Sequence, residues 1–302
     1  MADPAAHRPE PSWGRSVYGL QITGLDHVPE LGGPSDGRDP DLIPVEVSQS
    51  TETPPPPSAL DGDGGVLPLA DGRSLQVQRH TGRAAFYGPP LSTDQLAHPY
   101  LGPIAVIFNR WSGREVFHAA GFVAGGAAWI VLGRRTAGKS TLTAALAAAG
   151  VPVLADDIIV TDGEIAYAGP RNVDLREALP TGVLAHFRSE WSRQPMVRSR
   201  LGTRLRIALP GVEPRWPVGG WIFLNWGERT SLESVPISGL LGRLAAWRSE
   251  SQLPSDPTRL LAMASLPAFD LYRQRNFDAL PATVDLLLDT ATNASSVCQA
   301  AR

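Results

Sequence analysis

The chain has 302 residues, a formal net charge of −3 at pH 7 and no block of basic residues. This composition argues against bulk electrostatic binding to nucleic acid. The one cysteine, Cys298, leaves no partner for a disulfide within the chain, and no apolar run reaches the roughly 18 to 20 residues that span a bilayer. We therefore expect a cytoplasmic protein that binds neither nucleic acid nor membrane.

The first part of the chain predicts a small β-rich region over residues 16–111. Residues 1–15 are polar and rich in proline, so we expect a disordered tail before it. Four consecutive prolines lie within residues 50–65, which we interpret as a loop or linker. The strand candidates are residues 16–22, 39–47, 74–80 and 83–87. An apolar helix is expected over residues 101–111, beginning as early as Thr93.

Residues 112–290 alternate strand and helix patterns, which is typical of an α/β domain. The expected strands are residues 115–124, 127–132, 151–160, 165–167, 220–226 and 269–275. The expected helices are residues 141–149, 178–188, 238–248, 257–264 and 282–290. We expect the remaining residues, 291–302, to form a flexible tail.

The most specific motif is a phosphate-binding loop, GRRTAGKS, at residues 133–140. It follows an apolar strand and precedes a helix, as the G-x-x-x-x-G-K-[ST] motif requires. Its glycines let backbone N–H groups point at phosphate oxygens, and the helix N-terminus adds partial positive charge. The lysine reaches the β- and γ-phosphates, and the serine hydroxyl is placed for Mg²⁺. We therefore predict ATP binding by Gly133, Arg134, Arg135, Thr136, Ala137, Gly138, Lys139, Ser140 and Thr141.

Lys139 is the only lysine among 27 lysines and arginines. A coding bias toward arginine explains its rarity elsewhere. The position at which lysine remains is the one that needs a compact, mobile ammonium rather than a planar guanidinium.

Two adjacent carboxylates, Asp156 and Asp157, lie 17 and 18 residues after Lys139 in the strand pattern of residues 151–160. Neighbouring side chains of a strand point to opposite faces. One acid can then hold Mg²⁺ while the other takes the proton of an acceptor. The alternative is a solvated turn at a strand end.

Three further features have two interpretations each. Asp174 and Arg176 either complete the metal and phosphate shell or pair as a surface salt bridge. The arginine-dense stretch 193–206 is either a solvated face or a mobile lid whose arginines clamp phosphate. We expect the tryptophans of residues 220–226 to be packing residues rather than a base-stacking platform.

His118, the phosphate loop and the sequence Ala155-Asp156-Asp157 together resemble the catalytic domain of bacterial HPr kinase/phosphorylase, over residues 115–289. Residues 174–176, DLR, stand where that family has E-I-R. The resemblance implies a mixed sheet with helices, related to the phosphoenolpyruvate carboxykinase fold, here with a β-rich N-terminal extension. It implies that Asp157 deprotonates an acceptor serine with His118 beside it. Metal binding would fall to Ser140, Asp156 and Asp174. The family's phosphate-contacting arginine has no motif match, so Arg204 and Arg206 are candidates.

Three stretches further resemble the HPr-kinase-like enzymes of lasso-peptide clusters, which phosphorylate a hydroxyl at the C-terminal end of a precursor peptide. They are residues 18–20 with 29–31, residues 116–119, and residues 169–171 with 174–176. The sequence thus predicts an ATP- and Mg²⁺-dependent kinase that acts on a serine-type hydroxyl of a peptide or small protein. A homo-oligomer is compatible with it. The alternatives are an HPr-type protein serine kinase of another pathway and a nucleotide-gated binding or regulatory module. Asp157 separates the two classes, because a binding module needs no acceptor-facing base.

Overall fold

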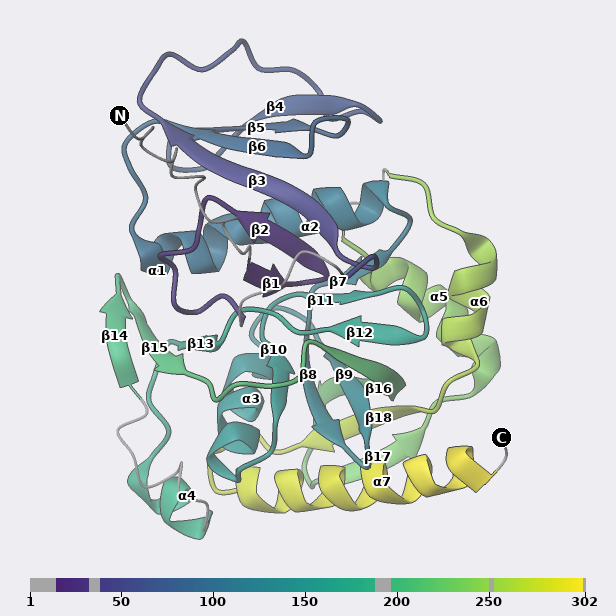
Figure 1. Cartoon of the computed structure of the whole chain (residues 1–302). Coiled ribbons are helices and arrows are strands. Elements are labelled where there is room, and N and C mark those ends of the chain that lie inside the picture. The colour runs from purple at the N-terminus through teal and green to yellow at the C-terminus, as the bar shows by residue number, and fades with distance from the viewer. Residues whose placement is uncertain (1–14, 33–38, 188–196, 250–252, 301–302) are drawn as a thin grey trace, which may run out of the picture.

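The computed structural model describes residues 15–32, 39–187, 197–249 and 253–300. A six-stranded sheet lies at one end of the molecule, and a nine-stranded mixed sheet forms its centre (Figure 1). A three-stranded sheet lies at the side. The α/β class expected from the sequence is therefore present, with both parallel and antiparallel strand pairs.

The N-terminal sheet has the order β1-β2-β3-β6-β5-β4. Its strands are β1 (Arg15–Val17), β2 (Leu20–Thr23), β3 (Ile43–Ser50), β4 (Gly64–Pro68), β5 (Ser74–Gln78) and β6 (Arg83–Tyr87). The single strand expected over residues 16–22 is wrong, since β1 and β2 form a hairpin there. Tyr18 and Gly19 both have positive φ, 55° and 71°, which is the backbone geometry of a tight hairpin turn.

A kinked helical segment joins the N-terminal sheet to the centre of the molecule. It comprises α1 (Thr93–Gln95), the turn η1 (Leu96–Tyr100) and α2 (Leu101–Trp111). The helix expected over residues 101–111 is confirmed. The helical start at Thr93 is present but is separated from α2, because His98 has extended backbone with φ of −161° and ψ of 130°. Nearly every residue of α2 is buried, because one core cluster contains its side chains together with those of the N-terminal sheet and of the central strands. A helix that is apolar all round is typical of such a position.

The central sheet has the order β10-β8-β9-β16-β12-β11-β7, and β18 pairs with both β16 and β17. Its strands are β7 (Glu115–Phe117), β8 (Ala119–Ala124), β9 (Ala127–Leu132), β10 (Val153–Ala155), β11 (Ile159–Thr161), β12 (Ile165–Tyr167), β16 (Arg215–Trp226), β17 (Ser231–Ser234) and β18 (Ala268–Arg273). The strands β9, β16 and β18 run parallel to one another. Their carboxyl ends therefore meet at one edge of the sheet.

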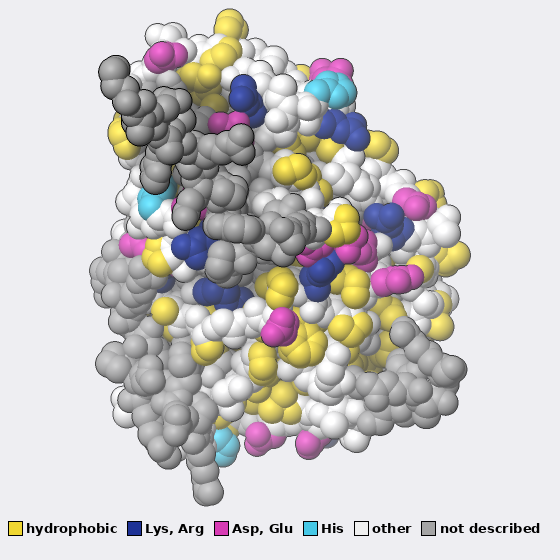
Figure 2. Space-filling model, in the orientation of Figure 1, with side chains coloured by type: hydrophobic (Ala, Val, Ile, Leu, Met, Phe, Trp, Pro, Cys, Tyr) yellow, Lys and Arg dark blue, Asp and Glu magenta, His cyan; other side chains and the backbone are white. Residues whose placement is uncertain are grey.

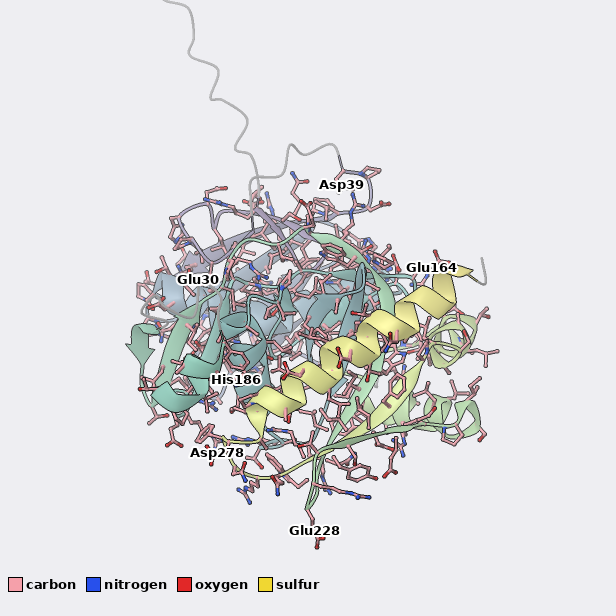
Figure 3. The ribbon with its side chains drawn as sticks, turned by 90° about the horizontal axis from the view of Figure 1, so that it is seen from below. Glu30, Asp39, Glu164, His186, Glu228 and Asp278 are labelled. Carbon is pink, nitrogen blue, oxygen red and sulfur yellow. The ribbon has the colours of Figure 1, made fainter. Side chains whose placement is uncertain are left out.

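Helices cover both faces of this sheet. α3 (Lys139–Ala148) and α7 (Leu280–Ala300) pack on one face, which α7 crosses in Figure 3. α5 (Ile237–Trp247) and α6 (Pro257–Ala264) pack on the other. Successive side chains of β16 alternate between the two faces of the sheet. Ile222 lies in the core with α3 and α7, and Trp221 lies in the core with α5 and α6.

Two expected elements differ from the structure in the second half of the chain. The strand over residues 151–160 is split into β10 and β11, because β10 pairs with β8 whereas β11 pairs with β7 and β12. The mobile loop over residues 193–206 is replaced in its described part by a hairpin of β14 (Val197–Leu201) and β15 (Arg204–Ala208). Arg193 lies outside the described residues. The hairpin forms the three-stranded sheet with β13 (Asn172–Leu175).

Two helices also differ in length from the sequence prediction. α4 (Thr181–His186) is shorter than the expected helix over residues 178–188, since Pro180 immediately precedes it. α7 extends to Ala300, whereas we expected a flexible tail from residue 291. Ala291 is 1% exposed within the core that α3 and α7 share, so packing continues the helix past residue 290.

The described surface carries mixed charge. On the face drawn in Figure 2, basic and acidic side chains lie interspersed rather than gathered in a patch of one sign. In the part of the chain that the structure describes, none of the helices has the length and apolarity to cross a bilayer.

The boundary expected between residues 111 and 112 can be tested by truncation. Arg110 and Glu115, both fully buried, form an ion pair across it, and Arg110 also donates to the carbonyl oxygen of Leu253 at 2.7 Å. A fragment of residues 112–302 would remove this partner and leave the buried Glu115 with only Arg248, whose Nη1 atom lies 3.8 Å from its Oε2. We expect it to melt without a cooperative transition and to bind the dye ANS, measured by circular dichroism and fluorescence. A cooperative melt would instead make the N-terminal region an independent extension.

Candidate functional site

The predicted phosphate loop lies between β9 and α3, at the edge where the parallel strands end. Gly138 has φ of 83° at the start of α3, and Thr136 also has positive φ. The exposed Arg134 and Arg135 form its outer part. The Nζ atom of Lys139 donates a hydrogen bond to the carbonyl oxygen of Gly133 at 2.6 Å. The lysine side chain thus folds back over its own loop.

Arg273 supports this loop through hydrogen bonds, and sequence analysis did not identify it. Its Nη2 atom donates to the carbonyl oxygens of Ala137 at 2.7 Å and Gly138 at 3.3 Å. A Cβ atom on Gly138 would lie 2.1 Å from that same Nη2. Glycine is therefore required there by contact as well as by φ.

Asp156 and Asp157 lie in the turn between β10 and β11, so the expectation that they face opposite sides of one strand is wrong. The backbone of Asp157 has φ of 73°, a left-handed conformation that aspartate tolerates better than most residues. Its carbonyl oxygen accepts from the N–H of Ala119 at 3.1 Å. The Nδ1 atom of His118 lies 3.2 Å from Oδ1 of Asp157. The turn thus brings together a carboxylate and the predicted histidine.

The two carboxylates have different environments. Burial raises the pKa of Asp156 to about 7, and the charge of Asp157 adds to this, against the opposing effects of a hydrogen bond with Ser140 and the charge of Lys139. Asp157 is more open, with 39% of its side chain exposed. Burial also lowers the pKa of Lys139 and that of His118, and Asp157 opposes both shifts. A partly buried ammonium and two acids therefore share one small volume.

Asp174 pairs with Arg206, not with Arg176. The two residues are direct cross-strand neighbours on β13 and β15. Arg206 donates from Nε to Oδ1 of Asp174 at 2.8 Å and from Nη2 to Oδ2 at 2.7 Å. Arg176 lies exposed beyond the end of β13. The surface salt bridge considered for Asp174 and Arg176 is therefore wrong.

Arg206 also forms hydrogen bonds with the helical segment that precedes α2. Its Nη1 atom donates to the carbonyl oxygen of Asp94 at 2.6 Å, and its Nη2 atom donates to that of His98 at 3.2 Å. The side chain is fully buried. Contact between Arg206 or Arg204 and a transferring phosphate stays a prediction.

A small cleft brings the predicted acids together with residues that the sequence analysis missed. It is lined by Tyr18, His98, Asp156, Asp157, Pro170, Asn172 and Asp174. His98 lies between two of the acids, with Nδ1 3.9 Å from Oδ2 of Asp157 and Nε2 4.0 Å from Oδ2 of Asp174. Tyr18 and His98 both come from the N-terminal region. Tyr18 belongs to one of the stretches that carry the lasso-peptide resemblance, whereas the sequence around His98 carried no signal for a site.

The oxygen donors beside the loop fit Mg²⁺. Oδ1 of Asp156 is buried without a hydrogen-bond partner among the described residues, and Asp156 also bonds Ser140. Mg²⁺ commonly takes one or two carboxylates, with phosphate oxygens and water completing its shell. Within the described residues, no group of three or more His, Cys, Asp or Glu forms a metal cage. Both oxygens of Asp174 already accept from Arg206, so its part in the shell stays a prediction.

Comparison with known proteins gives little more. No family model matches the chain, and no curated protein sequence matches it. Among solved structures it is similar to the HPr(Ser) kinase/phosphatase from Coxiella burnetii, with 15% sequence identity and a TM-score of 0.32 over 61% of this chain and 98% of that one. That structure belongs to the family that the sequence motifs resemble. The similarity is too low to assign the chain to it, so function has to come from the geometry of the site.

Replacing Arg206 should destabilise the protein strongly. Arg206→Met leaves the buried Asp174 without its cation, and breaking a buried pair in this way costs about 3–5 kcal/mol. The double variant Asp174→Leu/Arg206→Met should recover much of that loss. Urea denaturation measures the free energies of unfolding. The control is Arg176→Met, which should change stability by less than about 0.5 kcal/mol. Equal effects of Arg206→Met and Arg176→Met would contradict the pairing.

Asp156 should make the free protein less stable as the pH rises. Its pKa is raised in the folded state, so the folded protein binds more protons than the unfolded chain between about pH 4 and 7. The free energy of unfolding therefore falls as the pH rises through that window and stays lower above it. Asp156→Asn removes the effect, and we expect the variant to be more stable than wild type at pH 8 by at most about 4 kcal/mol.

The measurement is thermal unfolding at pH 5 and pH 8 without nucleotide or Mg²⁺. The gain should shrink at pH 5, where the wild-type carboxyl is protonated. A gain of the same size at both pH values would show that repacking rather than charge is responsible.

Proposed function

We propose that the protein is an ATP- and Mg²⁺-dependent kinase that phosphorylates a serine-type hydroxyl on a peptide or small protein. One observation carries this proposal. A phosphate loop and its lysine lie beside two adjacent carboxylates, of which one is buried next to the loop serine and the other is open to the cleft with a histidine at 3.2 Å. A nucleotide-binding module has no use for the second carboxylate.

Each residue then has a distinct task. The loop amides and Lys139 bind the phosphates of ATP, and Ser140 and Asp156 hold Mg²⁺, with Asp174 as a further candidate ligand. The metal ion neutralises negative charge on the phosphates when it is bound. His118 holds the carboxylate of Asp157 toward the cleft. Most of the rate then comes from positioning and charge neutralisation, as is usual for phosphoryl transfer.

The transfer step follows from this arrangement. The acceptor oxygen forms a bond to the γ-phosphorus while the bond from that phosphorus to the β–γ bridging oxygen breaks, and ADP leaves with the electron pair. The hydroxyl proton passes to a carboxylate oxygen of Asp157. General-base assistance of this kind contributes about 10²- to 10⁴-fold to a rate.

For the acceptor we propose the C-terminal residue of a lasso-type precursor peptide, as the sequence resemblance implies. All three stretches that carry this resemblance contribute residues to the site. Tyr18 and Asp174 line the cleft, and His118 contacts Asp157. The cleft is small, which favours a hydroxymethyl group over the ring of a tyrosine acceptor.

Asp157→Asn tests the proposal most directly. The substitution keeps the size of the side chain, and asparagine tolerates the left-handed backbone of this position. We expect ATP affinity close to wild type and transfer slower by about 10²- to 10⁴-fold. The measurement is single-turnover phosphorylation of a peptide that ends in serine, with ATP binding measured in parallel. Asp63→Asn, at an exposed side chain in the turn before β4, serves as the control.

Lys139→Ala completes the design, because it should weaken ATP binding and abolish transfer. Full activity of Asp157→Asn would leave the kinase without its base and favour a nucleotide-gated binding module. Loss of ATP binding in Asp157→Asn would instead place Asp157 in the metal shell.

A further inference from the structure

Trp226, the last residue of β16, is an exposed aromatic side chain beside the phosphate loop. It is 39% exposed, whereas Trp221 on the same strand is fully buried. The other exposed large hydrophobic side chains of the described chain, Ile237, Leu241 and Leu261, lie on α5 and α6. We expected the tryptophans of this stretch to be packing residues, and that holds for Trp221 but not for Trp226.

The ring of Trp226 is fixed in place by the same arginine that supports the loop. The guanidinium carbon of Arg273 lies 4.3 Å from the ring centroid, within the range of a cation–π contact. Arg273 in turn donates to the carbonyl oxygens of Ala137 and Gly138. A Cβ atom on Gly138 would lie 3.4 Å from Cη2 of Trp226, so the ring borders the loop itself. The exposed Arg275 lies 5.8 Å from the ring centroid.

The order of the strands decides which end of a nucleotide would approach Trp226. The turn with Asp156 and Asp157 follows β10, which lies on one side of β9 beyond β8. β16 and β18 lie on the other side of β9. A triphosphate on the loop must direct its γ-phosphate toward the acids for transfer to occur. Its nucleoside then leaves toward the carboxyl ends of β16 and β18.

Figure 3 labels Glu228, in the turn just after Trp226, and that turn projects from the body of the protein. Ligands of open parallel sheets bind outside the carboxyl ends of the strands, which is where Trp226 and Arg273 lie.

We propose that Trp226 is the stacking platform for the base of the bound nucleotide and that Arg273 holds its ring in position. This inference rests on the proposed function for the phosphate loop and adds a nucleoside subsite to it. Every base has a π-face, so stacking discriminates weakly among bases. ATP and GTP should therefore bind with similar affinity, and both should bind more tightly than a triphosphate without a base.

Binding of three ligands tests the subsite: ATP, ribose 5-triphosphate and inorganic tripolyphosphate, each with Mg²⁺ and measured by calorimetry on the full chain. Stacking on an aromatic side chain is worth about a five- to hundredfold change in affinity per base. Trp226→Ala should weaken ATP binding by that factor and leave tripolyphosphate binding unchanged. Trp226→Phe should keep most of the ATP affinity. Leu241→Ala, at a side chain of matched exposure, should change neither.

The outcomes separate this inference from the proposed function. Equal weakening of ATP and tripolyphosphate in Trp226→Ala would mean that the ring only supports the loop, and would overturn the subsite. Unchanged ATP affinity in that variant would overturn it too. The wild-type protein provides a test that needs no variant, since equal affinity for ATP and ribose 5-triphosphate would exclude a base contact. Failure of the wild type to bind any of the three ligands would instead contradict the proposed function.

Discussion

The buried ion pair of Arg206 and Asp174 is the interaction on which the site most depends. Arg206 uses its donors on Asp174, on Asp94 and on the carbonyl oxygen of His98, so one guanidinium joins β13, β15 and the helical segment before α2. The pair lies at the cleft wall, and this segment carries His98 into the same cleft. The N-terminal region is thereby tied to the acids of the cleft rather than merely linked to them along the chain.

The site contains desolvated charged groups whose cost a bound ligand would reduce. Asp156 is buried beside a second carboxylate, and a lysine with a lowered pKa lies nearby. Folding alone gains nothing from that arrangement, since each charge costs desolvation free energy. A divalent cation and a triphosphate supply the missing charges of both signs. Active sites commonly sacrifice stability in this way, and the strained backbone of Asp157 points in the same direction.

The sequence was sufficient for features that depend on local pattern and insufficient for those that depend on distant contacts. The loop between β9 and α3 and the elements α2, β6, β12 and α6 follow from periodicity, glycines and capping residues, and the structure contains them. Phosphate binding by that loop stays a prediction. The turn at Asp156 and Asp157 could not be foreseen, because the buried runs on either side of it pair with different strands. Arg206 was a candidate from the resemblance, but its buried pairing with Asp174 could not be foreseen, and neither could the positions of Tyr18 and His98. Each reaches the site through contacts between segments far apart in the chain, which no local pattern encodes.

The position of β16 in the chain determines when the central sheet can form during synthesis. β9 carries the phosphate loop, yet its parallel neighbour β16 ends at residue 226 and the next strand, β18, at residue 273. At about 5–20 residues per second of synthesis, the edge of β9 waits roughly 5–20 s for its partner. An apolar strand with an open edge is a template for pairing with other chains. The edge of β9 is therefore open to pairing with other chains through that interval, and the sheet beside the loop can be completed only after residue 273 has been made.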